Sequence, residues 1–266
     1  MSQAMPPDYP NDFRMMNPPP APAPKRTGAW TVVALVALIL AIVVILNETM
    51  LKISKVAVIG NDTVPWEDVI RAAGLDRPVS YFSVDEKKIA QGVQSNHLLI
   101  FERLEKQFPN GLTLYVRERK PVVLVQEMGA EYVLDEEGMV LSRRGKGEES
   151  QDSLMIVTGL KPKDLQVGRV MTAGSSRHTE AYKALVQEVL LQGILSQVSE
   201  LNMTDPDSLY LITVDGYTAH LGDTSQLRAK IGTARAVVAY LRQEGMTGGM
   251  LEVSIPGEAV YTPGGN

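Results

Sequence analysis

The chain consists of a short polar stretch, one long apolar run, and a large remainder in which apolar and polar positions alternate. The apolar run, residues 29–46, reads AWTVVALVALILAIVVIL and contains no charge, glycine or proline. At about 1.5 Å per residue, a helix of this length spans about 27 Å, close to the ~30 Å hydrocarbon core of a bilayer. We therefore predict a transmembrane helix over residues 29–46.

Two other interpretations of this run are less consistent with its pattern. A buried core helix would carry polar residues along one face. A cleaved signal peptide has an apolar region of about 7–15 residues followed by a small-x-small cleavage site. This run is longer, and it leads into Asn47-Glu48-Thr49-Met50, where no such site occurs. An uncleaved signal anchor is the interpretation that remains.

The charges that flank the run indicate its orientation only slightly. Lys25 and Arg26 precede it, whereas Glu48 follows it, with Lys52 and Lys55 farther on. The excess of positive charge near the first end favours a cytoplasmic N-terminus. The 220 residues after the run are then expected outside the cytoplasm.

Residues 1–28 are rich in proline, including the run Pro18-Pro19-Pro20. Such a stretch cannot bury enough apolar surface to offset the entropy lost on ordering. We expect a disordered tail with polyproline-II character that acts as a passive linker. A ligand for a proline-recognition domain is the alternative.

From residue 53 the alternation predicts strand, helix, helix, strand and strand within about 68 residues. Ser83 and Glu86 have the spacing of a capping box, which predicts that the second helix starts at Ser83. The predicted elements are a strand at 52–59, a helix from Pro65 to Gly74, a helix from Ser83, and strands at 98–107 and 112–118.

Beyond Pro121 the pattern predicts a second α+β domain with a mainly antiparallel sheet. Asp215-Gly216 predicts a tight hairpin with a type I′ turn. Residues 143–152 are expected to form a charged loop. The other predicted elements are strands at 122–125, 132–140 (a hairpin turning at 136–138), 154–157, 194–203, 209–214, 217–221, 250–255 and 259–262, and helices at 177–192 and 225–244.

Composition narrows the functional classes. The chain has no cysteine, which excludes disulfides and thiolate sites and is compatible with an oxidising compartment. Its net charge is −5, and without the tail it has 23 basic and 29 acidic residues. A surface with this balance is not expected to bind nucleic acid or anionic lipid.

No pattern in the chain predicts catalysis, a metal or a cofactor. The Gly-x-Ser-x-Gly turn of many serine hydrolases is absent. The three histidines, His97, His178 and His220, are too far apart in sequence to form a paired ligand motif. Asp205-Pro206-Asp207 lacks the remainder of a calcium loop. We therefore predict no catalytic residues, no metal site, no cofactor and no enzymatic activity.

Several segments resemble a known family. KVAVIGNDTV, GLDRPVSYFSVDEKKIAQGV and PNGLTLYVRERKPV resemble the POTRA module of the FtsQ/DivIB cell-division proteins, including the Gly60-Asn61 turn and the exit Val116-x-Glu118-Arg119-x-Pro121. MIVTGL, YTAHLGDTSQLRAKIGTARAVVAYL and GMLEVSIPGEAVYTP resemble that family's β domain. The chain departs from the family in its penultimate strand. That strand often carries an Ile-Asp-Leu-type sequence and a basic residue in the family, whereas here it reads Leu251-Glu252-Val253 followed by Ser254. That departure leaves the charge of a preferred partner open.

The resemblance implies a domain organisation: a cytoplasmic tail at 1–28, a signal anchor at 29–46, a POTRA domain at 53–120 and a β domain at 121–263. It implies a non-enzymatic divisome scaffold in the plasma membrane at the division septum. Its implied partners are bitopic division proteins of the FtsL and FtsB/DivIC types and the septal penicillin-binding protein complex. The alternative is a POTRA-type component of polypeptide transport or membrane-protein assembly, which would require tandem modules or a membrane barrel.

The resemblance also implies a binding site, because in the family the C-terminal strands of the β domain bind these bitopic proteins. We expect a partner strand to add to the strand at 259–262, with Glu258 and Tyr261 discriminating between partners. The alternative is that these residues only complete the sheet. The implied partner-binding residues are Leu251, Val253, Ile255, Glu258, Ala259, Val260, Tyr261 and Thr262.

Overall fold

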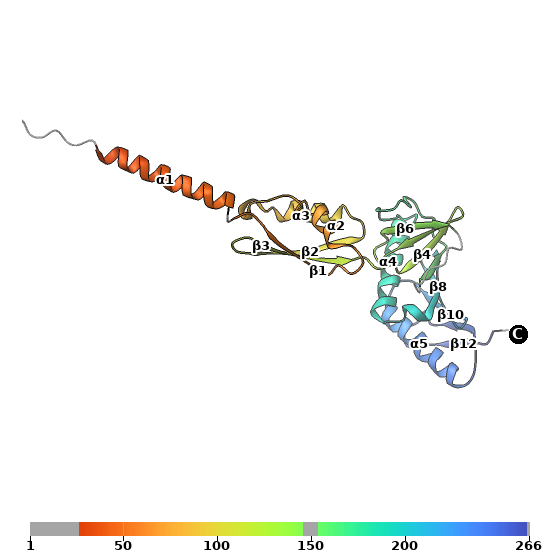
Figure 1. Ribbon diagram of the computed structural model, residues 1–266. Helices are drawn as coiled ribbons and strands as arrows, with labels where there is room; N and C mark the ends of the chain where they lie inside the picture. Colours follow the sequence, from red (N-terminus) through yellow and green to blue (C-terminus); the bar gives the residue numbers. More distant parts are fainter. Residues whose placement is uncertain (1–26, 50, 146–153, 265–266) are drawn as a thin grey trace, which may run out of the picture. The chain divides into compact units, whose positions relative to one another are not determined.

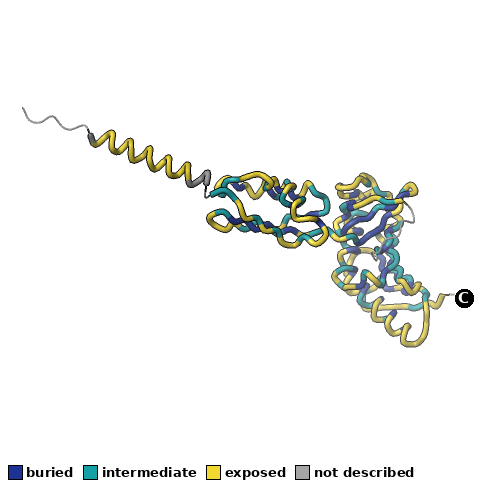
Figure 2. The backbone as a smooth tube through the Cα atoms, viewed as in Figure 1, coloured by how far each residue is buried: buried dark blue, intermediate teal, exposed yellow. Residues whose placement is uncertain are grey.

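The computed structural model describes residues 27–49, 51–145 and 154–264, and it separates into two units, residues 1–50 and 51–266. The first unit contains helix α1 (Thr27–Thr49). Its window Gly28–Ile45 has a mean hydropathy of 2.8 and is not buried, so α1 is long and apolar enough to cross a membrane (Figure 2). The helix agrees with the predicted span and continues three residues beyond residue 46.

The second unit begins with a small domain, residues 51–120, that has its own core (Figure 1). The observed order strand, helix, helix, strand, strand is the predicted one, with a short 3-10 turn at Tyr81–Ser83. The sheet order is β1-β3-β2, with β1 parallel and β2 antiparallel to β3. The elements are β1 (Lys55–Ile59), α2 (Trp66–Ala72), α3 (Glu86–Gln94), β2 (Leu99–Gln107) and β3 (Gly111–Glu118).

Helix α3 begins later than the sequence predicts. Its N-cap is Asp85, whose carboxylate accepts hydrogen bonds from the amides of Lys87 (3.0 Å) and Lys88 (3.4 Å). The predicted Ser83–Glu86 capping box is wrong, because the Ser83 hydroxyl donates instead to the Ser80 carbonyl at 3.0 Å. A carboxylate at the positive end of a helix is favourable, so Asp85 serves as the cap.

The turn at Gly60 and the exit at Glu118 close this domain together. Gly60 has φ +95°, and a Cβ at this position would collide with the Val116 carbonyl. The Glu118 carboxylate accepts the amides of Asp62 (2.6 Å), Thr63 (2.8 Å) and Val64 (2.7 Å). Burial alone would raise the pKa of Glu118, but these bonds and one from the Thr63 hydroxyl hold it below its ordinary value.

The second domain, residues 121–264, is built on a nine-stranded sheet in the order β12-β11-β10-β9-β8-β7-β4-β5-β6. Five of its pairings are antiparallel and three are parallel, which confirms the predicted mainly antiparallel α+β fold. The elements are β4 (Val123–Glu127), β5 (Ala130–Leu134), β6 (Val140–Gly145), β7 (Met155–Thr158), α4 (Ser176–Leu191), a 3-10 turn (Leu195–Gln197), β8 (Val198–Asp205), β9 (Ser208–Thr213), β10 (Tyr217–Gly222), α5 (Leu227–Gln243), β11 (Gly249–Glu252) and β12 (Val260–Thr262).

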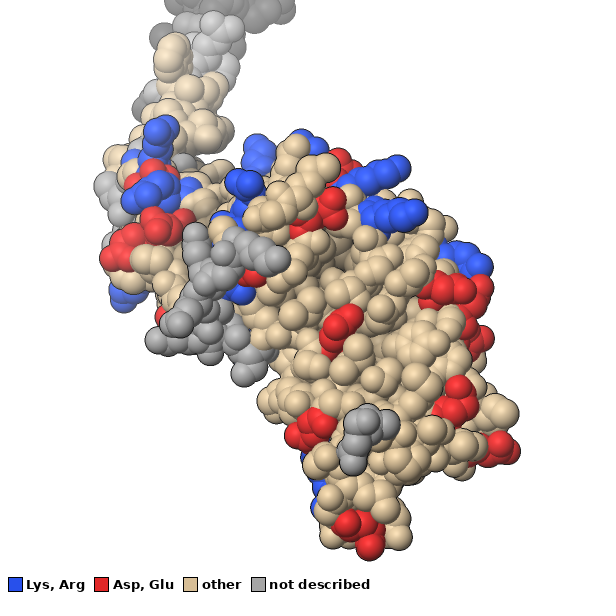
Figure 3. Space-filling view, turned by 90° about the vertical axis from the view of Figure 1, so that its right-hand side faces the viewer, with Lys and Arg blue, Asp and Glu red and all other residues tan. Residues whose placement is uncertain are grey.

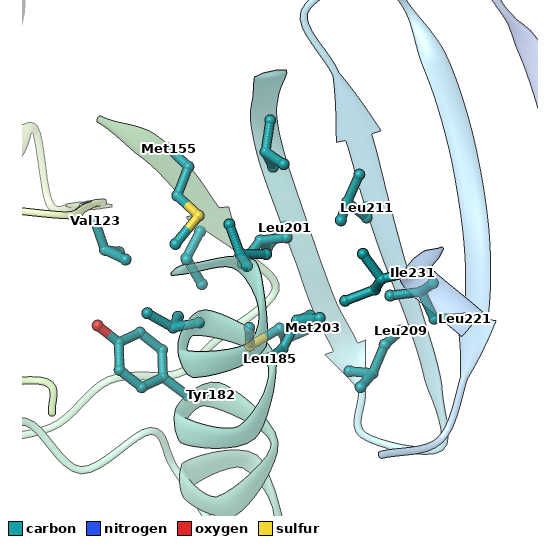
Figure 4. Close-up of a cluster of buried hydrophobic side chains, with 14 of the residues drawn as sticks. Val123, Met155, Tyr182, Leu185, Leu201, Met203, Leu209, Leu211, Leu221 and Ile231 are labelled. Atoms are coloured by element: carbon teal, nitrogen blue, oxygen red, sulfur yellow. The ribbon is translucent and has the colours of Figure 1, made fainter. Parts of the chain in front are cut away.

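Helices α4 and α5 supply the apolar side chains that pack against one face of this sheet. Tyr182 and Leu185 of α4 and Ile231 of α5 lie in one cluster with Leu201 and Leu209 of the strands (Figure 4). All five are buried. Both helices predicted in this domain are therefore confirmed, and among the described residues no helix of this domain covers the opposite face of the sheet.

Three local predictions in this domain are wrong. Residues 194–197 form a turn, so the predicted strand begins only at Val198. Arg143 and Arg144 belong to β6 rather than to a loop, and residues 146–153 lie outside the described residues. The turn between β9 and β10 is not type I′, because Gly216 has φ +82° whereas Asp215 has no positive φ. The Gly216 amide donates to the Thr213 carbonyl at 3.0 Å, which makes a three-residue loop.

The two domains meet at Arg119, directly after β3. Its guanidinium pairs with Asp135 and, at 2.8 Å, with Glu137. The hydrogen bond from Arg119 holds the pKa of Glu137 below its ordinary value. Tyr182 donates to the Asp135 carbonyl at 2.8 Å, which ties this cluster to α4.

Candidate partner-binding edge

Strand β12 lies at one end of the nine-stranded sheet and, among the residues that the structure describes, pairs with β11 alone. The pairing is antiparallel, with Val260 opposite Glu252, Tyr261 opposite Leu251 and Thr262 opposite Met250. Within the described ranges, no backbone hydrogen bond forms on the side of β12 that faces away from β11. The main chain of β12 is therefore available for pairing with another strand.

Alternation along β11 and β12 separates the side chains into two sets. Leu251 is fully buried on the face that the helices cover, and Tyr261 opposite it is half-buried, with its hydroxyl donating to the Gly248 carbonyl at 3.1 Å. Directly paired residues share a face. Met250, Thr262 and Val260 are exposed on the other face, Val260 by 64%. We call this other face, over β8 to β12, the open face.

The predicted binding residues are distributed unevenly. Leu251 and Val253 are buried in the core, so their side chains support the edge from behind. Tyr261 is half-buried on the same side. The exposed members are Ile255, Glu258, Ala259, Val260 and Thr262.

Two exposed residues beside the edge are missing from the predicted set. Met250 and Glu252 lie on the open face in register with Thr262 and Val260. The alternation in Met250-Leu251-Glu252-Val253 is the signal that distinguishes them, since only every second residue of a strand can face the core.

Gly249 determines how closely β12 approaches β11. Its φ is +109°, and a Cβ at this position would lie 2.7 Å from both the Thr262 carbonyl oxygen and the Tyr261 ring. Real Cβ atoms do not approach other atoms so closely, so only glycine allows the observed pairing at this point.

A chain of polar side chains crosses the open face next to the edge. His220 Nδ1 lies 2.7 Å from a Glu252 oxygen, and its Nε2 lies 2.9 Å from the Ser208 hydroxyl. The His220 ring stacks on Tyr210 with centroids 4.6 Å apart. Burial alone would raise the pKa of Glu252, but hydrogen bonds from Ser254 and His220 hold it below its ordinary value.

The order Ser208–His220–Glu252 is that of a hydrolase triad, but the surroundings do not fit catalysis. A nucleophilic serine needs free N–H donors to stabilise the oxyanion that forms. Strand β9 is paired on both sides, with β8 and with β10, so its amides are engaged in the sheet. We assign these three residues to a cross-strand hydrogen-bond chain that holds Glu252 in place.

The surface near the edge carries little charge. Figure 3 shows that the lower part of the second domain, where Figure 1 places β10, α5 and β12, is largely uncharged on this side. The charged side chains visible there are mostly acidic. Glu252 and Glu258 are the exposed acidic residues nearest to β12 in the chain. In the described part of the chain, no cluster of His, Asp and Glu fits a metal ion.

An apolar helix, a small β-α-α-β-β domain and a nine-stranded α+β domain define a class of proteins in which one apolar helix precedes a POTRA module. Comparison with family models gives two matches: the FtsQ-type POTRA domain over residues 51–119 and the C-terminal domain of cell division protein FtsQ/DivIB over residues 123–253. The chain belongs to the FtsQ/DivIB family of cell-division proteins, a non-catalytic division family. The second match ends at Val253, so β12 lies beyond it.

Individual relatives have low sequence identity to this chain, but the matches cover most of both sequences. The chain is 19% identical over 210 residues to cell division protein DivIB of Clostridium tetani, covering 79% of this chain and 78% of that protein. It is 22% identical over 204 residues to cell division protein FtsQ of Syntrophotalea carbinolica, covering 71% and 70%. A solved extracytoplasmic domain of DivIB from Geobacillus stearothermophilus matches with 18% identity, 47% and 96% coverage and a TM-score of 0.31. That score adds nothing to the family assignment.

Proposed function

We propose that this chain is a non-enzymatic divisome scaffold, held in the plasma membrane at the division septum. Its tail (1–28) lies in the cytoplasm, its anchor (29–46) crosses the membrane, and its POTRA domain (53–120) and β domain (121–263) work outside the cytoplasm. The family assignment supports a role in division, and α1 supports the anchor.

The proposed partners are bitopic division proteins of the FtsB/DivIC and FtsL types, one of which adds a strand to β12. The unpaired outer side of β12 is the observation that carries this proposal. A strand added there would gain main-chain hydrogen bonds, and alternate side chains would supply specificity. Val260 and Thr262, with Met250 and Glu252 beside them, are the proposed contacts on the open face.

The remaining predicted residues have supporting roles in this proposal. Leu251, Val253 and Tyr261 hold β11 and β12 against the core, while Ile255, Glu258 and Ala259 border the approach to the edge. Through the captured partners, the chain would bring the septal penicillin-binding protein complex to the division site and help to organise or regulate septal peptidoglycan synthesis.

The test is a binding titration with the full chain in lipid nanodiscs and the extracytoplasmic segments of FtsB/DivIC-type and FtsL-type proteins, alone and together. Val260→Pro removes a main-chain donor from β12. Loss of one interstrand hydrogen bond, at about 1 kcal/mol, weakens binding on the order of 5-fold.

Ser142→Pro is the matched control, because it places proline in β6 at the opposite edge of the same sheet. It is expected to leave binding unchanged. A folded Val260→Pro protein that binds with wild-type affinity would contradict the proposed site. If neither segment binds the wild-type chain, alone or together, the scaffold proposal fails and the polypeptide-transport alternative returns.

A further inference from the structure

Three aromatic rings gather at one end of the POTRA domain without being buried. Tyr81 and Phe82 belong to the 3-10 turn before α3, and Phe108 follows β2. The Tyr81 ring meets those of Phe82 and Phe108 edge to face, with centroids 5.6 Å and 5.8 Å apart. Phe82 is 71% exposed and Phe108 is 73% exposed. A cluster of exposed aromatic side chains favours contact with a protein partner or a membrane.

This aromatic end is also the end at which the chain enters the domain from the membrane helix. The Tyr81 amide donates to the Leu51 carbonyl at 2.7 Å, and the Ser54 amide donates to the Asn110 carbonyl at 3.1 Å. The hairpin that carries Phe108 is therefore tied to the first residues after the helix. Trp66, which is 54% exposed, follows the opposite end of β1, about 13 Å away along a five-residue strand.

The length of the connection limits how far this end can lie from the bilayer. The apolar window of α1 ends at Ile45, and the helix continues to Thr49. Four more helical residues add about 6 Å, which is roughly the thickness of one headgroup layer. From Thr49, two residues reach Leu51 over at most ~7 Å. If α1 crosses the bilayer as proposed above, Leu51 can lie no farther than this from the end of α1, which is close enough for large aromatic side chains to reach the headgroups.

The charges around the rings suit the same surface. The segments that carry or border the rings, residues 51–55, 80–88 and 105–110, contain five lysines and three acids, Asp85, Glu86 and Glu105. This local excess of positive charge contrasts with the net charge of −5 for the whole chain. It favours a membrane surface, since basic residues near a bilayer are attracted to anionic headgroups. The lysines are Lys52, Lys55, Lys87, Lys88 and Lys106.

We propose that Tyr81, Phe82 and Phe108 form an interfacial anchor that inserts into the headgroup region of the bilayer crossed by α1. An aromatic ring that carries a polar group, as in Tyr81, is favoured at the level of the headgroups, where its apolar part meets the acyl chains and its hydroxyl meets water. The contact would fix the POTRA domain against the outer surface of the membrane, so that α1 is not its only attachment.

The test uses the full chain reconstituted in vesicles of phosphatidylcholine and phosphatidylglycerol, with brominated lipid as the quencher of tryptophan fluorescence. In one variant Trp30→Phe, Trp66→Phe and Phe82→Trp leave a single tryptophan at position 82. In the matched variant Trp30→Phe leaves Trp66 as the only tryptophan. Circular dichroism confirms that both are folded.

The expected result is a blue-shifted emission at position 82 that brominated lipid quenches strongly, and a weaker effect at Trp66. Adding Phe108→Asp to the first variant should reduce the quenching, because a carboxylate opposes insertion beside the ring. Equal quenching at the two positions, or none at position 82, would overturn the proposal. The vesicles contain no other protein, so a cluster that instead binds a protein partner gives the second of these outcomes.

Discussion

The two edges of the nine-stranded sheet differ in how far the chain protects them. At β6, the Val140 amide donates to the Arg169 carbonyl and the Gly168 amide donates to the Val140 carbonyl, both at 2.9 Å. His97 lies 3.1 Å from the Leu141 carbonyl, and Arg143 and Arg144 follow. At β12, the three residues Val260, Tyr261 and Thr262 carry no charge, and among the described residues no segment covers the strand in this way.

Natural sheets protect their edges with charge, short strands or covering segments, because an unpaired edge invites another strand. This chain uses a covering loop and arginines at β6, whereas at β12 it uses only shortness. The difference indicates that β12 is the edge kept available, and the following predictions test that difference.

The largest effect is expected from Gly249→Ala. The new Cβ would meet Thr262 and Tyr261 in a backbone with positive φ, at roughly 3 kcal/mol of strain, so β12 should separate from β11. Partner binding should be lost, and thermal unfolding should show a lowered midpoint. Gly245→Ala is the control, because it also places a side chain on a backbone with positive φ (+74°) but has no atom within 4 Å. Equal binding by the two variants would remove β12 from the site.

A smaller effect is expected at the protected edge. Arg144 pairs with Glu131 at 3.1 Å, and the Glu131 side chain is only 8% exposed. Arg144→Ala leaves that carboxylate buried with one remaining donor, Gln126, so the free energy of unfolding should fall by about 2 kcal/mol. Denaturant titration measures that loss. Affinity for the partner should not change in the same variant, and a parallel loss of affinity would show that the β6 edge takes part in binding.

The smallest effect concerns pH at the open face. The pKa of Glu252 in the folded chain lies below the ordinary 4.5, so its contribution to stability is present above pH 4.5 and is lost as pH falls through the folded value. Glu252→Gln should therefore make the loss of β12 pairing in acid less steep. Amide exchange of residues 260–262 across that pH range measures it. Identical acid profiles for wild type and variant would show that Glu252 does not stabilise the edge.

Long periodic elements could be predicted from the sequence, because their signal repeats many times. The apolar run of α1 and the helices α4 and α5 were predictable for this reason. Single-residue features were less predictable: Asp85 competes with Ser83 for the cap of α3, and the turn at Asp215-Gly216 accommodates a third residue.

Which strands pair could not be read from local pattern. β10 and β11 are parallel neighbours only because α5 crosses between them, and the contact of Ser208, His220 and Glu252 depends on that pairing. The placement of Leu251 and Val253 was available from alternation, since both share the parity of buried positions in β11. The family resemblance implied a binding role for both together with the exposed residues, because it transfers whole strands rather than faces.

Hydrogen exchange of the full chain in nanodiscs, with and without the FtsB/DivIC-type and FtsL-type segments, tests the central claim most directly. Addition of a strand to β12 predicts slower exchange of the amides at 259–262 on binding, with exchange across β6 (Val140–Gly145) unchanged. Unchanged exchange at 259–262 in a saturated complex, with new protection elsewhere, would contradict the account.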